Sequence, residues 1–180
     1  MLNIDYVEEF IRGFFTAEYA ALVAVYSEPD DDIVAQLEQK AMTYLHVEPG
    51  HIMSLGFGRP PGLSPEEVAK DADYVSELQE RVLFLIIRYQ RQEGNDLYGC
   101  FVSSTQKLSG LAYASCFYVT AIDGEAKIIA HYTPGLYSPE ESLTWRRLDG
   151  STIDNPGHPV EARKFVPPTM PAHLEHYNAA

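Results

Sequence analysis

Residues 117–133, FYVTAIDGEAKIIAHYT, place the strongest constraint on what this chain can fold into. Two strand-like stretches flank Asp123-Gly124, a dipeptide typical of the two-residue turn that joins antiparallel strands. Such a turn leaves little freedom of register, so the segment predicts the closing hairpin of an antiparallel sheet. Alternating patterns before it predict further strands, and the four expected strands cover about residues 80–92, 96–104, 111–121 and 126–133.

Helical patterns occupy the chain before these strands. Apolar residues recur at helical spacing from Ile4 to Val25, which predicts one long amphipathic helix over about residues 3–27. A second helix is expected after Asp30, whose side chain can cap its first turn. A third, short helix is expected at SPEE, residues 64–67, where a capping serine, a proline and a capping-box glutamate follow one another. Helices followed by an antiparallel meander predict an α+β fold.

The sequence changes character at Pro134. Residues 134–180 carry seven prolines and show little periodicity. We therefore expect an α+β domain over residues 1–133, in which two to three N-terminal helices pack on a curved antiparallel sheet. The Pro-rich C-terminal extension, residues 134–180, is expected to pack as an extended tail on this domain or on a partner.

The composition argues against several classes of function. The formal net charge is −13 and the pI is near 4.7, whereas a protein that binds nucleic acid needs a basic face. The acidic balance leaves room for a basic protein partner, although net charge also serves solubility. The N-terminus MLNIDYVEEF lacks a signal-peptide pattern, and the run VLFLII is too short to span a membrane. With only two cysteines, we expect a cytoplasmic protein with reduced thiols.

The closing turn also predicts which residues share a face of the sheet. If pairing continues evenly from the turn, Cys116 lies opposite His131, and Ser115 lies opposite Tyr132. A bulge would move part of either row to the other face. Extended over the sheet, the expected rows are Tyr89, Cys100, Cys116 and His131 on one face, and Arg88, Phe101, Ser115 and Tyr132 on the other.

The second of these rows is expected to meet the helices, because it shares its face with Phe117, Val119 and Ile128. A pocket between helices and a curved sheet is mostly apolar and has a few placed polar groups. The alternative is that the tyrosines are core residues with hydroxyls at the rim, and that the arginine reaches water. The candidate ligand-binding residues are Arg88, Tyr113, Ser115 and Tyr132.

No pattern in the chain specifies a catalytic or metal site. Cys116 and His131 form a conceivable nucleophile pair, but no third group that would orient them is evident. Cys100 and Cys116 are expected to be small buried residues rather than a disulfide. HLEH places His173 and His176 three apart, and a tight metal site needs more ligands. We therefore predict no catalytic residues, no metal and no cofactor.

The order of the elements resembles the NTF2-like superfamily, which is also called cystatin-like or SnoaL-like. The resemblance covers about residues 3–133 and is carried by the long opening helix, the segment SPEEVAKDADYV and the closing hairpin. It implies a cone formed by helices on a curved sheet, with a pocket for a small apolar ligand. It also implies a homodimer through the other face of the sheet. The family includes isomerases, cyclases, dehydratases, transport factors and bacterial immunity proteins.

We expect a non-catalytic module that binds a ligand or another protein. One alternative is an isomerase- or dehydratase-type enzyme, which would need a pocket carboxylate with a raised pKa. No strand supplies such a group on the expected register, so it would come from Asp5, Glu8 or Glu18 on the first helix. A second alternative is an acidic immunity or inhibitor protein that acts against a basic toxin.

Overall fold

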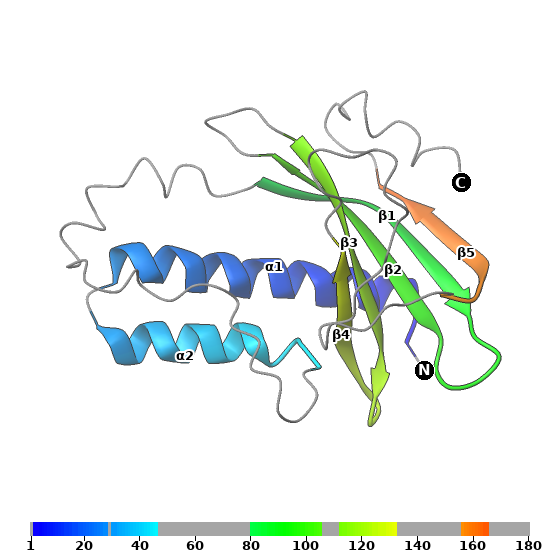
Figure 1. Ribbon diagram of the computed structural model, residues 1–180, viewed down its shortest axis with the longest axis horizontal. Helices are drawn as coiled ribbons and strands as arrows, with labels where there is room; N and C mark the ends of the chain where they lie inside the picture. Colours follow the sequence, from blue (N-terminus) through cyan, green and yellow to red (C-terminus); the bar gives the residue numbers. More distant parts are fainter. Residues whose placement is uncertain (1, 29, 47–79, 106–111, 133–155, 166–180) are drawn as a thin grey trace.

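Two N-terminal helices pack on one face of an open, curved antiparallel sheet (Figure 1). The computed structural model describes residues 2–28, 30–46, 80–105, 112–132 and 156–165. Along the sheet the strands follow the order β4-β3-β2-β1-β5, and the predicted α+β class is confirmed. The elements are α1 (Ile4–Ser27), α2 (Asp31–Met42), β1 (Glu80–Gln90), β2 (Leu97–Thr105), β3 (Ala112–Ile122), β4 (Glu125–Tyr132) and β5 (His158–Lys164).

Side-chain caps determine where both helices begin. The Asn3 side chain accepts a hydrogen bond from the Tyr6 backbone N–H at 2.8 Å and so satisfies a donor that α1 leaves unpaired. Asp30 accepts from the backbone N–H groups of Asp32 and Ile33, which confirms the predicted N-cap of α2. Both helices therefore begin close to where the sequence places them.

The hairpin between β3 and β4 has the predicted turn. Asp123 and Gly124 both adopt positive φ angles, 51° and 87°, and Ile122 pairs with Glu125. Two positive φ angles are characteristic of the type I′ turn, whose twist matches that of the flanking strands. The four expected strands are all present, and each of their ends lies within two residues of its predicted position.

The register of the sheet differs from the predicted one. Val119 pairs with Ile128 but Tyr118 pairs with Ala130, so Ile129 is an extra residue that forms a bulge in β4. Beyond the bulge, Cys116 pairs with Tyr132 and not with His131. The predicted cross-strand pairing of Cys116 with His131 is therefore wrong.

The pairing of β2 with its neighbours is displaced as well. Cys100 pairs with Phe117, and Phe101 pairs with Cys116, whereas the even register placed Cys100 opposite Cys116. Residues 91–96 join β1 to β2, so the connection is longer than residues 93–95, which the expected strands leave between them. The two predicted rows are consequently mixed, because a shift of one residue transfers a side chain to the other face.

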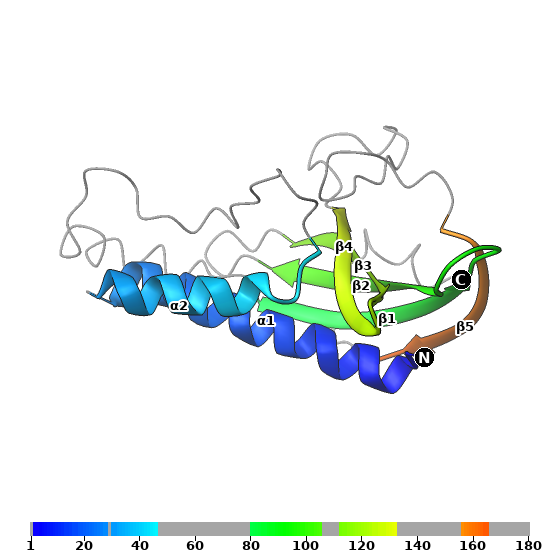
Figure 2. The same cartoon turned by 90° about the horizontal axis from the view of Figure 1, so that it is seen from below.

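One face of the sheet packs on α1. The helix contributes Ile4, Val7, Ile11 and Phe14, and the buried Tyr98 hydroxyl donates a hydrogen bond to the Leu2 carbonyl oxygen at 2.7 Å. Figure 2 shows that both helices lie on the same side of the sheet. The strand residues of this helix-facing core are Leu83, Ile86, Tyr98, Cys100, Val102, Phe117, Val119, Ala126 and Ile128.

The opposite face is also apolar and buried. Its side chains cluster around three aromatic rings, those of Phe84, Phe101 and Tyr118, with Tyr89 packed against them. Phe101, predicted to face the helices, belongs to this face instead. The remaining buried members are Leu85, Ile87, Leu97, Cys116 and Ala130.

A fifth strand, β5, lies within the segment that the sequence predicts to be an extended tail. It pairs with β1 in antiparallel orientation. Its Arg163 forms an ion pair with Asp5 of α1 and lies 3.6 Å from Glu8, measured from Nη1 to Oε2. Because nearly all residues of β5 are exposed, the strand lacks the apolar alternation that would have predicted it.

The other edge of the sheet is covered in part by the chain that follows α2. The His46 N–H donates to the Ile128 carbonyl oxygen at 2.9 Å, and the Ile128 N–H donates to the Tyr44 carbonyl oxygen at 2.8 Å. The Lys127 ammonium adds a 2.8 Å hydrogen bond to the Thr43 carbonyl oxygen. These contacts satisfy backbone groups that an edge strand would otherwise leave open.

Several predictions concern residues outside the described ranges. They are the short helix at 64–67, the two tail histidines His173 and His176, and most of the Pro-rich extension. Of the helices in the described ranges, none combines the length and apolar character that crossing a membrane requires.

Replacing Gly99 with valine should test the packing of the second face. A Cβ atom at Gly99 would lie 3.1 Å from a Tyr89 ring carbon and 3.2 Å from ring carbons of both Phe101 and Tyr118. Because three packed rings would have to move, we expect Gly99→Val to lower the free energy of unfolding by about 1–3 kcal/mol. Urea denaturation monitored by circular dichroism measures this change.

Gly13→Ala is the matched control. The three atoms nearest to its Cβ would all belong to the Tyr44 side chain, and the closest is the hydroxyl oxygen at 2.9 Å, the far end of that side chain. The gain in helix propensity, up to about 1 kcal/mol, opposes the contact, so stability should change little. A Gly99→Val variant as stable as the Gly13→Ala variant would contradict the packing described for this face.

Candidate functional site

A group of charged and aromatic side chains lies where α1 passes the sheet, and we call it the Arg81 cluster. It consists of Phe15 and Glu18 on α1, Arg81 on β1, Phe117 on β3 and His131 on β4. Phe15 and Glu18 are three apart on α1, so they lie on the same side of the helix. Phe117 and His131 are cross-strand partners, which the bulge at Ile129 brings into register. Four separate elements therefore build the cluster.

The ion pair between Glu18 and Arg81 is the polar part of this cluster. Arg81 Nη1 donates to Glu18 Oε2, and the two side chains retain only 14% and 20% exposure for Glu18 and Arg81 respectively. Burial raises the pKa of Glu18 above its usual value, while the charge and hydrogen bond of Arg81 oppose that shift. The carboxyl group of Glu18 therefore takes up a proton more readily than an exposed glutamate does.

Aromatic rings surround the guanidinium group. Its central carbon lies 5.4 Å from the ring centroid of Phe15 and 5.5 Å from that of Phe117. Contacts of this kind contribute about 0.5–2 kcal/mol each, and more where water is excluded. The two rings are themselves 5.5 Å apart and inclined at 64°. Arg81 is thus positioned by packing as well as by its ion pair.

The imidazole of His131 completes the cluster. It stacks on Phe117 with a centroid separation of 4.2 Å and an interplanar angle of 9°. Burial lowers the pKa of His131 to about 4, and the positive charge of Arg81 acts in the same direction. The ring is therefore neutral near pH 7 and adds no charge to the site.

The cluster contains one group suited to binding, Arg81, and two groups whose pKa values are shifted, Glu18 and His131. A guanidinium carries five N–H donors, and within the described ranges Glu18 is the acceptor that Arg81 reaches. Arg81 thus keeps donor capacity for a second acceptor. Glu18 and His131 titrate from shifted values, but the carboxylate is engaged in its ion pair and is not a free base.

The structure places two of the four predicted ligand-binding residues apart from each other. Arg88 is paired with Asp96, with Nε–Oδ2 and Nη2–Oδ2 distances of 2.8 and 2.7 Å. Ser115 is buried and pairs with Val102 of the helix-facing core. Arg88 pairs with Tyr98, which in turn pairs with Val119. Val119 lies four positions from Ser115 along β3, about 13 Å at roughly 3.3 Å per residue.

The other two predicted residues, Tyr113 and Tyr132, are described only by their backbones. Tyr113 pairs with Ser104, and Tyr132 pairs with Cys116. Their side chains lie outside the described part of the structure.

Sequence reasoning missed Arg81 and Phe15 but included Glu18 among three candidate acids. Of these acids, Asp5 pairs with Arg163 of β5, and Glu8 pairs with Arg12 and approaches Arg163, whereas Glu18 turns toward β1. The pattern that could have found the site is an arginine at the start of the apolar run RVLFLII, because a charge entering a buried strand needs a partner.

Cys100 and Cys116 are buried free thiols, as predicted. Cys100 belongs to the helix-facing core and Cys116 to the opposite face, so they do not share a row. Burial raises the pKa of both thiols, which keeps the reactive thiolate scarce near neutral pH.

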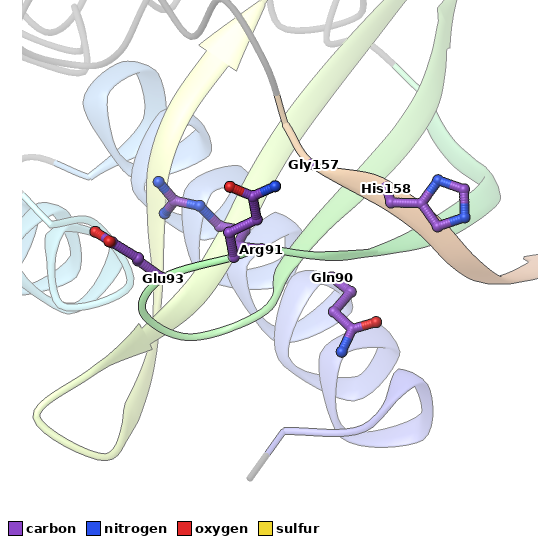
Figure 3. Close-up of a pocket in the computed structure, with 6 residues that line it drawn as sticks. Gln90, Arg91, Glu93, Gly157 and His158 are labelled. Atoms are coloured by element: carbon purple, nitrogen blue, oxygen red, sulfur yellow. The ribbon is translucent and has the colours of Figure 1, made fainter.

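An open groove of about 560 Å³ lies at the end of β1, beside the start of β5 (Figure 3). Figure 3 shows the Gln90 side chain directed away from that of Arg91, while His158 extends along β5 away from both. Its polar groups therefore do not converge on one point, as those of a specific site do. The lining residues are Gln90, Arg91, Gln92, Glu93, Gly157 and His158.

Comparison with known proteins adds no relative. No protein-family model matches the chain, and neither a curated protein nor a solved structure matches it significantly. Within the described residues, no three histidine, cysteine, aspartate or glutamate side chains are grouped so that they could hold a metal ion.

Replacing Arg81 with methionine should raise the pKa of His131. Arg81 contributes to the lowering of that pKa, and burial, the larger cause, remains in the variant. We therefore expect the pKa of His131 to rise from about 4 but to stay below the ordinary histidine value of 6.5. A pH titration that follows the carbon-bound imidazole protons by NMR measures the pKa of His131 in the wild type and in the variant. An unchanged value would show that the guanidinium charge does not reach the ring.

The stability of the fold should depend on pH through His131. Its folded pKa, about 4, lies below its unfolded value near 6.5, so the unfolded chain binds the proton more readily between them. The stabilising contribution is present above pH 6.5 and is lost as the pH falls toward 4. By linkage it amounts to at most about 3 kcal/mol.

His131→Phe keeps an aromatic ring at this position but cannot ionise. We expect the wild type to lose more free energy of unfolding than this variant between pH 7 and pH 4.5. Urea denaturation at pH 7 and at pH 4.5 gives the loss of free energy of unfolding for each protein. Glu18 is present in both proteins and contributes equally to both losses. Parallel losses would contradict a buried neutral imidazole.

Proposed function

We propose that the chain is an NTF2-like, non-catalytic binding module that holds a small organic molecule between α1 and the sheet. The observation that carries this proposal is a partly exposed guanidinium at the margin of an otherwise apolar helix–sheet interface. Ligand sites in proteins combine an apolar lining with a few placed polar groups. The Arg81 cluster provides this combination, with Arg81 as the polar group that fixes the orientation of the ligand.

The layout of the chain supports the NTF2-like part of this proposal. Its helices come first, and an antiparallel meander from β1 to β4 follows, with α1 packed on one face of the curved sheet. This is the order in which NTF2-like domains form a cone. The ligand would enter this cone beside Arg81, because one fifth of that side chain is open to solvent.

A small-molecule enzyme of the isomerase type is the second candidate. One observation favours it, namely that burial raises the pKa of the Glu18 carboxyl group, as a general acid–base requires. The ion pair with Arg81 argues against it, because a carboxylate held by a guanidinium is a weaker base than a free one. Binding without chemistry therefore fits the geometry better.

The proposals about protein partners concern other surfaces. An acidic inhibitor would use the net charge of −13, and α2 begins with the acidic run Asp30–Asp32. The resemblance to the NTF2-like superfamily implies a homodimer through the second face of the sheet. The residues of that face are already buried in the single chain, and the dimer stays a prediction.

NMR of the full chain with para-cresol, a neutral and soluble aromatic probe, tests the proposed binding. We expect saturable changes in the backbone amide shifts of Phe15, Glu18, Arg81, Phe117 and His131. Changes confined to the groove around Gln90 and His158 would place binding elsewhere and contradict the proposal. The absence of any saturable change would contradict it as well.

A further inference from the structure

We infer that the ligand of the Arg81 cluster is a small aromatic carboxylate, which binds Arg81 in the place of Glu18 while Glu18 takes up a proton from solvent. This inference rests on the proposed binding function and names its ligand class and its regulation. No covalent bond changes in this exchange. One carboxylate leaves the guanidinium, another arrives, and one proton moves from water to Glu18.

The geometry of Arg81 selects a carboxylate. A guanidinium presents its donors in a planar fork that matches the two oxygens of a carboxylate. Its charge is already directed at one such group, that of Glu18, which shows the position and the chemistry of the acceptor. The side chain is also held in place by Phe15 and Phe117, so little rotational freedom would be lost when a ligand binds.

The surroundings of Arg81 select an aromatic body for that ligand. Phe15 and Phe117 are inclined to each other at 64°, and His131 lies parallel to Phe117. Inclined and stacked arrangements are the favourable contact geometries of aromatic rings. Because the imidazole is neutral near pH 7, it adds ring surface to the cluster without a second positive charge.

The uptake of a proton by Glu18 follows from the burial of its carboxyl group. If a ligand displaced it as a carboxylate, an unpaired negative charge would remain in a partly buried position beside the negative charge of the ligand. Protonation removes that penalty, and burial already favours the protonated form. Arg81 from β1 and His131 from β4 are the titratable groups of the cluster around Glu18, whose neighbours one turn away on α1 are the apolar Phe14, Phe15, Ala21 and Leu22.

The net charge of the protein does not prevent an anion from binding here. The chain carries a formal charge of −13, which repels anions at long range. At physiological ionic strength that repulsion is screened beyond about 8 Å, whereas a partly buried pair is screened much less. The attraction between the guanidinium of Arg81 and a carboxylate in contact with it therefore outweighs the long-range repulsion by the net charge.

Binding of para-toluate, para-toluamide and para-cresol to the full chain, followed by NMR at pH 5.5 and pH 7.5, tests this inference. The first probe is ionised throughout this range, and the other two are neutral molecules of similar shape. We expect para-toluate to bind about tenfold more tightly than para-toluamide at pH 5.5, which corresponds to about 1.4 kcal/mol. Its affinity should fall as the pH rises, by up to about tenfold per pH unit where one proton is taken up.

Three variants separate the roles of the two charged residues. Arg81→Gln should abolish the preference for para-toluate, and Glu18→Gln should strengthen para-toluate binding and remove its pH dependence. Arg12→Gln is the matched control, because Arg12 also has a carboxylate partner, Glu8 at 2.9 Å, and an aromatic ring, Phe165 at 5.7 Å. It should leave all three affinities unchanged. Circular dichroism of each variant shows whether the fold is retained.

Failure of the inference differs from failure of the proposed function. If para-cresol binds at the cluster and para-toluate binds no better than its amide, the module binds neutral ligands and the inference is wrong. A folded Arg81→Gln variant that keeps the full preference would also overturn it, and so would weaker para-toluate binding by Glu18→Gln. If none of the three probes binds, the proposed function itself fails.

Discussion

The packing of one stripe of α1 against the sheet is the contact on which the rest of the structure depends. Ile4, Val7, Ile11 and Phe14 bury this stripe, and the ring of Phe14 meets that of Phe117 at 5.7 Å with an interplanar angle of 64°. Once this stripe packs against the sheet, the residues beside it on α1 have fixed neighbours. Glu18 is brought to Arg81, and Asp5 at the start of the helix is brought to β5. The apolar contact thus determines which charges can pair.

Those two ion pairs on the same helix differ in their physical setting. The pair of Arg163 with Asp5 is largely exposed to water, and pairs of this kind contribute about 0–1 kcal/mol to stability. The pair of Arg81 with Glu18 is mostly buried, where the attraction is stronger but the loss of hydration opposes it. A buried pair therefore adds little net stability while it remains intact, and breaking it is costly. This asymmetry suits a position where one carboxylate can replace another.

Much of the fold follows from local patterns in the sequence, and much of the site does not. The cap of α2, the strand positions and the turn at Asp123-Gly124 depend on neighbouring residues, so they could be predicted. The site depends on register, and the extra residue Ile129 moves His131 away from Cys116 and onto Phe117. No local pattern in the sequence predicts that bulge. Arg81 was missed for a related reason, since its partner lies 63 positions away in the chain.

The position of β5 has a consequence for how the chain folds as it is synthesised. The strands from β1 to β4 pair with their sequence neighbours, whereas β5 returns to β1, and its Arg163 reaches a partner 158 positions earlier. Contacts so distant in sequence close a large loop and form slowly compared with hairpins. The helices and the first four strands can therefore assemble while the ribosome is still adding residues. The outer edge of β1 gains its strand partner only after Lys164 has emerged, so a chain cut short before β5 would retain its meander and expose an edge open to other chains.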